Sequence, residues 1–92
     1  MIIRVLLLAF RRPGDKPEYR EVEIPDTEFT GEQGQDLSKV FYYGQNDFQP
    51  RDQRSVSVGD VIIYGDNNYR VESSGFSRVY ATKAKGFVFE EI

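Results

Sequence analysis

The segment VFYYGQNDFQPRDQR, at residues 40–54, sets aromatic rings beside amides, carboxylates and arginine side chains. Flat rings next to planar hydrogen-bonding groups suit the recognition of a nucleic-acid base, a peptide or another polar ligand. The segment therefore predicts a binding surface. Its candidate residues are Tyr42, Tyr43, Gln45, Asn46, Asp47, Phe48, Arg51 and Arg54. In this hypothesis Phe48 is the apolar anchor, and the two arginines supply charge complementarity.

Two other interpretations of this segment stay open. Amides and carboxylates often bond to nearby backbone in irregular segments, so these side chains could stabilise the loop itself while Phe48 packs in the core. Alternatively, rings interleaved with Arg51 and Arg54 are typical of proteins that bind single-stranded nucleic acid. The basic residues at 11, 12, 16 and 20 would extend such a patch, but the net charge of −3 opposes phosphate binding.

The composition excludes several kinds of catalytic and metal site. The chain has no cysteine and no histidine, so it lacks thiolate ligands, the commonest general base and the commonest zinc ligand. The sequence Asp66-Asn67-Asn68 lacks the spaced oxygen ligands of a calcium loop. We therefore expect no catalytic residue, no metal and no cofactor, and a binding protein instead of an enzyme. A carboxylate-dependent enzyme is the third hypothesis.

Charge and hydropathy are distributed unevenly along the chain. Residues 21–36 contain six acidic side chains and no basic one, which predicts a solvated strand edge and loop or, alternatively, a contact for a basic partner.

The apolar opening MIIRVLLLAF contains Arg4 and leads into Arg11-Arg12-Pro13 without a small-residue cleavage site. It therefore predicts a buried strand and not a signal peptide, and it is shorter than the roughly 20 residues of a membrane span. We expect a cytoplasmic protein without membrane contact.

A short helix should position the first candidate residues. Asp36 is its predicted N-cap, the helix covers residues 36–43, and Gly44 is the C′ residue. Apolar residues at i, i+3 and i+4 spacing form the stripe that should dock on a sheet, namely Leu37, Val40 and Phe41. With that stripe buried, one ring of the neighbouring tyrosine pair should lie at the rim.

The remaining pattern predicts strands joined by turns. Residues 2–10 indicate a central strand covered on both faces, and residues 19–24 alternate as its hairpin partner, with Val22 and Ile24 inward. Gly59-Asp60 predicts a bend capped by the aspartate, and residues 65–68 predict a hairpin turn. Strands are expected on both sides of that turn and again near residues 76–80 and 86–89.

Together these elements predict one α+β domain over residues 1–92. It should contain a curved antiparallel sheet, or a partly closed small β-barrel, with one short helix. An exposed edge strand in residues 87–92 could pair two copies of the chain.

The runs YGQNDFQPR, RSVSVGDVI and YRVESSGF, with the turn at residues 65–68 between the last two, resemble the YodL-like group of small domains from phages, plasmids and other mobile elements. The resemblance covers about the central 40 residues. It implies that Asn46, Asp47, Phe48, Ser57, Gly59, Asp60, Tyr69 and Phe76 belong to one structural unit. It carries no activity over to individual residues. The function that it implies is that of an accessory protein that contacts a host macromolecule, for which we expect a host protein.

Overall fold

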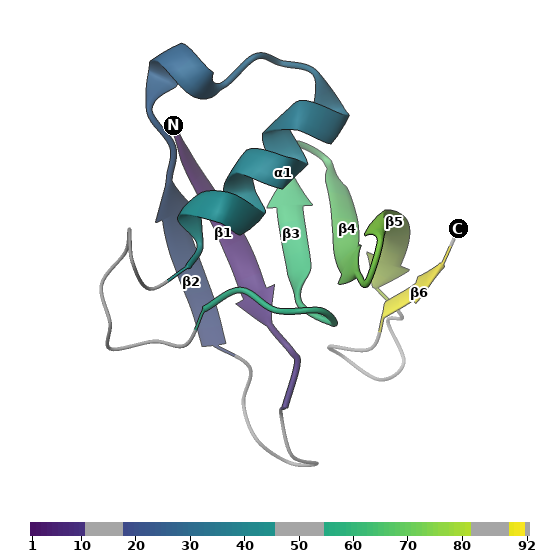
Figure 1. Cartoon of the computed structure of the whole chain (residues 1–92). Coiled ribbons are helices and arrows are strands. Elements are labelled where there is room, and N and C mark those ends of the chain that lie inside the picture. The colour runs from purple at the N-terminus through teal and green to yellow at the C-terminus, as the bar shows by residue number, and fades with distance from the viewer. Residues whose placement is uncertain (11–17, 46–54, 82–88, 92) are drawn as a thin grey trace.

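The computed structural model describes residues 1–10, 18–45, 55–81 and 89–91, with side chains up to residue 80. Its elements are β1 (Ile2–Leu7), β2 (Glu18–Glu23), a 3-10 helix η1 (Asp26–Glu28), α1 (Gln33–Tyr43), β3 (Val61–Tyr64), β4 (Asn67–Glu72), β5 (Gly75–Ala81) and β6 (Phe89–Glu91). The strands form one antiparallel sheet in the order β2-β1-β3-β4-β5-β6. The helix α1 crosses one face of this sheet (Figure 1).

The α+β class and the curved antiparallel sheet are thus confirmed. Among the described residues, β2 and β6 stand at opposite ends of the strand order and do not pair. The sheet is therefore open, and the prediction of a partly closed barrel is wrong.

The strand β1 lies inside the sheet, as predicted, because it pairs with both β2 and β3. Ile3, Val5 and Leu7 face α1 and belong to the main core, which also holds Val22 and the other buried residues of that face. The opposite face of β1 is covered only in part. Leu6 packs there with Val61 and Val79, whereas Ile2 is 56% exposed. The prediction that both faces of this strand are buried is therefore wrong for its first half.

The helix α1 begins at Gln33, three residues before the predicted start, and its N-cap is Glu32. Asp36 is not the N-cap, which corrects the prediction. Its buried carboxylate instead accepts hydrogen bonds from the Thr30 and Gly31 amides, at 2.8 and 2.9 Å. Those amides lie before the helix, so the carboxylate fixes the chain that leads into the helix.

The face of α1 that packs on the sheet also differs from the prediction. Leu37 and Val40 are buried as expected, but Phe41 is 36% exposed, and the partly buried Tyr43 packs against the core instead. At 100° per residue, Phe41 lies about a quarter turn from the centre of the buried stripe. It therefore faces the side of the helix.

Gly44 ends the helix for a reason other than the one predicted. Its φ is −76°, so it does not adopt the left-handed conformation of a C′ glycine. A Cβ at this position would lie 2.4 Å from Cγ2 of Val56 and 2.9 Å from the Val40 carbonyl oxygen. Glycine is needed because the chain beyond the helix passes so close.

The predicted bend before β3 is confirmed. Gly59 has a φ of +98°, which favours glycine. The buried carboxylate of Asp60 accepts hydrogen bonds from the amides of Ala9 and Ser57, each at 2.8 Å. The turn between β3 and β4 is shorter than predicted, because Tyr64 and Asn67 already pair across it.

Candidate binding surfaces

The structure describes three of the residues predicted to form the binding surface, namely Tyr42, Tyr43 and Gln45. The others lie outside the described residues: Asn46, Asp47, Phe48, Arg51 and Arg54. The predicted dimer contact in residues 87–92 also falls largely outside them.

The two tyrosines at the end of α1 have different environments. The Tyr42 ring is 52% exposed and meets the Tyr43 ring edge to face, with 5.0 Å between the ring centroids. The Tyr43 hydroxyl donates a hydrogen bond to Glu28, and this bond is the main reason why the pKa of Tyr43 is raised to about 12. The prediction that one ring of the pair would lie at the rim is confirmed, and that ring is Tyr42.

Gln45 has a structural role in the described part of the chain. Its Nε2 donates hydrogen bonds to the carbonyl oxygens of Phe41, at 2.8 Å, and Val56, at 3.1 Å. The side chain thus ties the end of α1 to the segment before β3. For this residue, the structure agrees with the interpretation in which polar side chains hold nearby backbone.

An apolar groove lies between α1 and the hairpin of β4 and β5. It has a volume of about 230 Å³ and is lined by Phe41, Val58, Val71, Glu72, Ser73, Gly75 and Phe76. At its rim, the exposed Val58 (53%) accompanies Phe41. We call Phe41, Tyr42 and Val58 the helix-end surface. Sequence reasoning placed Phe41 in the core, although its position a quarter turn from the stripe's centre was the signal that could have revealed its exposure.

Glu72 is the charged residue in the lining of this groove. Its Oε1 is buried, makes no hydrogen bond with a described residue, and forms an ion pair with Nη1 of Arg70 at 3.8 Å. A buried carboxylate oxygen without a donor is unfavourable, so a donor brought by a ligand would gain from meeting it.

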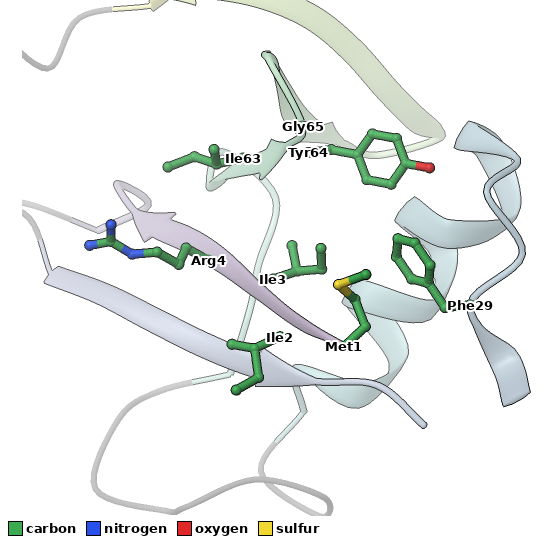
Figure 2. A pocket seen from close by; sticks show the side chains of 8 residues that line it. All are labelled: Met1, Ile2, Ile3, Arg4, Phe29, Ile63, Tyr64 and Gly65. Carbon is green, nitrogen blue, oxygen red and sulfur yellow. The ribbon is translucent and has the colours of Figure 1, made fainter. Parts of the chain in front are cut away.

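A larger cleft of about 550 Å³ opens between β1 and the turn after β3 (Figure 2). It lies at the opposite end of the strands from the groove. Its lining is apolar except for one charged side chain and consists of Met1, Ile2, Ile3, Arg4, Phe29, Ile63, Tyr64 and Gly65. Figure 2 shows Phe29 and Tyr64 on one side of the cleft and Arg4 beside Ile63 on the other. No sequence pattern pointed to this cleft.

The Tyr64 ring in the wall of the cleft is held in place by a buried acid. Its hydroxyl donates a 2.6 Å hydrogen bond to Oδ2 of Asp36, which is the main reason why the pKa of Tyr64 is raised to about 12. Burial would raise the pKa of Asp36, but the hydrogen bonds from Tyr64, Thr30 and Gly31 together hold it below the usual value. The pair is a structural contact, because its hydrogen-bonding groups are occupied by the protein itself.

Two kinds of feature are absent from the part of the chain that the structure describes. No three acidic side chains gather there as a metal site would require. No helix in the same part of the chain is long and apolar enough to cross a membrane.

Comparisons with protein-family models, curated proteins and solved structures found no match. The likeness to the YodL-like group therefore stays a prediction.

Proposed function

We propose that this chain is a non-catalytic binding module of a phage or another mobile element, and that it docks a host protein in the cytoplasm. The observation that carries the proposal is the helix-end surface. Phe41, Tyr42 and Val58 expose 36%, 52% and 53% of their surface, respectively, and two of them border the groove beside α1.

Large side chains with this exposure suit protein recognition. Aromatic residues dominate the binding energy of many interfaces, particularly where they surround a pocket that takes up a partner side chain. The groove offers such a pocket, since Val71 and Phe76 supply further apolar lining behind Phe41. The partner should therefore insert one aliphatic or aromatic side chain between α1 and the β4–β5 hairpin.

Charge adds a second requirement for the partner. The Glu72 carboxylate lies in the same groove, with a buried oxygen that pairs with Arg70 at 3.8 Å but accepts no hydrogen bond from a described residue. A lysine or arginine next to the inserted side chain would supply a donor in a charge-assisted hydrogen bond. We therefore propose a partner segment that pairs one apolar anchor with one basic residue.

The residues that follow α1 in the sequence form the second part of this proposal. Phe48, Arg51 and Arg54 were predicted as an anchor and its charged neighbours. They begin a few residues after Tyr42, so the chain order is compatible with one continuous surface.

The test compares immobilised wild type with a Phe41→Ala/Val58→Ser variant, using nuclease-treated host lysate. Tyr80→Ala is the matched control, because Tyr80 is 46% exposed on β5. Each captured protein is identified, purified and titrated against all three forms. We expect direct binding that the double variant weakens by about tenfold or more and that the control leaves unchanged.

Two outcomes would contradict the proposal. Equal binding by the double variant would remove the helix-end surface from the interface. Capture that disappears after nuclease treatment, together with a binding constant that falls with salt at a slope near −0.7 per phosphate, would favour the single-stranded nucleic-acid alternative.

A further inference from the structure

We propose that a second copy of this chain regulates the helix-end surface by inserting its Phe10 ring into the groove between α1 and the β4–β5 hairpin. This inference rests on the proposed function, because it names a second occupant for the same groove. Two copies related by a twofold axis exchange their Phe10 rings. The dimer then covers the surface that the host protein needs.

Phe10 is the residue whose conformation the fold explains least. Its ring is 83% exposed, more than any other large apolar side chain in the described part of the chain. Its φ is +65°, and no other described residue apart from glycines has a positive φ. This conformation is unfavourable for a residue with a Cβ, and an exposed ring adds little burial to the fold. Such backbone outliers point to function, so the ring serves a contact outside its own chain.

The structure holds Phe10 at the same end of the sheet as the groove. The amide of the preceding Ala9 donates a 2.8 Å hydrogen bond to Oδ1 of Asp60, and a Cβ at Gly59 would lie 3.5 Å from Cβ of Ala9. The Gly59 amide donates to the Val71 carbonyl oxygen at 2.8 Å, and Val71 lines the groove. Figure 1 shows the end of β1 and the bend before β3 at this end of the sheet.

An exposed ring next to a groove on one molecule suits a twofold dimer. Phe10 is not among the described residues that line the groove, so it does not fill the groove of its own chain. A twofold axis between ring and groove brings each ring to the groove of the other copy, in two equivalent contacts. The groove of about 230 Å³ is smaller than the roughly 300–1,000 Å³ of small-molecule sites. Its size therefore suits a single side chain.

Charge also favours this occupant. Glu72 is the charged residue among the described residues that line the groove. Arg11 follows Phe10 directly in the sequence. A basic residue thus accompanies the apolar anchor, and this is the combination that the groove requires of a partner segment.

The contact area predicts a weak dimer. An aromatic side chain buries about 150–250 Å². Two rings and the groove walls that they cover therefore bury about 600–1,000 Å² in total. Specific interfaces bury roughly 1,000 Å² or more, so the two copies should exchange reversibly. The groove is then open to a host protein when the chain is dilute.

The first test is analytical ultracentrifugation of the full chain over a concentration series that reaches the millimolar range. We expect wild type to convert reversibly from monomer to dimer. Phe10→Asn and Phe41→Ala/Val58→Ser should each weaken association by about tenfold or more, whereas Tyr80→Ala, at a 46% exposed position on β5, should leave it unchanged. Asparagine tolerates the left-handed backbone, so the melting temperature of Phe10→Asn should not fall.

Mixing two variants tests the contact itself. Isotope-labelled Phe10→Asn has the groove but no ring, and unlabelled Phe41→Ala/Val58→Ser has the ring but an altered groove. We expect the mixture to shift the amide signals of Val71 and Phe76 in the labelled chain. A mixture of labelled and unlabelled Phe10→Asn should shift neither signal.

The outcomes separate this inference from the proposed function. Wild type that stays monomeric would overturn the inference but not the host contact. A dimer that Phe10→Asn leaves unchanged would also overturn it and favour pairing through an edge strand. A lower melting temperature of Phe10→Asn would overturn it by giving the ring a role in the fold. A dimer that forms as expected, in a chain that captures no host protein, would overturn only the proposed function.

Discussion

Replacing Asp36 with asparagine should destabilise the fold although the two side chains have nearly the same shape. The carboxylate is fully buried. Its Oδ1 accepts from the Thr30 amide and hydroxyl at 2.8 and 3.0 Å, and its Oδ2 accepts from the Gly31 amide and the Tyr64 hydroxyl at 2.9 and 2.6 Å. An asparagine can retain one acceptor oxygen but places an NH₂ group where the other oxygen was.

The magnitude follows from the bonds that change. The substitution removes the acceptor for two donors, and hydrogen bonds to a charged group contribute about 1.5–3 kcal/mol each. Taking the lower value for both donors gives a loss of roughly 3 kcal/mol in the free energy of unfolding. At about 4–8 °C per kcal/mol for a domain of this size, the melting temperature should fall by roughly 12–24 °C.

The assay is a double-mutant cycle of Asp36→Asn with Tyr64→Phe, measured by urea unfolding. The coupling energy should be about 1.5 kcal/mol, the contribution of one hydrogen bond to a charged acceptor. Tyr69→Phe is the control, because Tyr69 is buried beside Tyr64 but its hydroxyl makes no hydrogen bond with a described residue. A coupling energy below about 0.5 kcal/mol for the Tyr64 cycle would refute the reasoning.

The same carboxylate predicts the direction of an acid effect. Its pKa is lowered in the folded state, so its contribution to stability is present above the unfolded pKa of about 4 and is lost as the pH falls through the folded value. The difference in stability between wild type and Asp36→Asn should therefore be constant near neutral pH and shrink below about pH 4. A difference that grows on acidification would contradict this assignment.

Three further predictions concern the helix end, the tyrosines and the bend. Gly44→Ala should cost about 1–3 kcal/mol by overpacking, whereas Gly34→Ala, whose Cβ would meet only a side-chain oxygen at 3.4 Å, should be neutral or stabilising; equal effects in urea unfolding would refute the close approach. Tyr43 and Tyr64, with pKa values raised to about 12, should stay neutral above the ordinary tyrosine pKa of about 10. The stability they add is present below about pH 10 and is lost as the pH rises through about 12; it would be contradicted if ultraviolet titration of Tyr43→Phe or Tyr64→Phe lost an ionisation near pH 10 relative to wild type. Asp60→Ala should cost about 2 kcal/mol or more, because two backbone amides lose their acceptor, and an unchanged melting temperature would exclude this role.

Most of the sheet could be predicted because alternation reports directly on a buried face. Val22 and Ile24 are fully buried, and each follows an exposed glutamate, Glu21 and Glu23. The glycine and aspartate of the bend before β3 have local conformational reasons. The start of the helix could not be predicted in this way. Asp36 has the residue type of an N-cap, but its role depends on Tyr64, which lies 28 positions further along the chain.

The candidate surfaces were less predictable than the fold. The exposure of Tyr42 followed from a limit on how many side chains one helix face can bury. The groove and the cleft depend on tertiary relations instead, namely the side of α1 that faces the β4–β5 hairpin and the position at which the β1–β3 ladder stops. The helical position of Phe41 could have indicated its exposure, but nothing in the neighbouring sequence indicates the groove or the cleft.

The short ladder between β1 and β3 also joins two halves of the sheet by few residue pairs. The β1–β2 hairpin has six residue pairs and the β4–β5 hairpin has five, but the junction between β1 and β3 has three. That junction pairs Val5 with Ile62. Because these residues are far apart in the sequence, their pairing closes the longest loop of the sheet, and we expect it to form last during folding. We therefore expect amide hydrogen exchange in the sheet to occur through transient separation of β1 from β3. A ligand that contacts both Ile2 and Ile63 would hold β1 and β3 together and slow their separation.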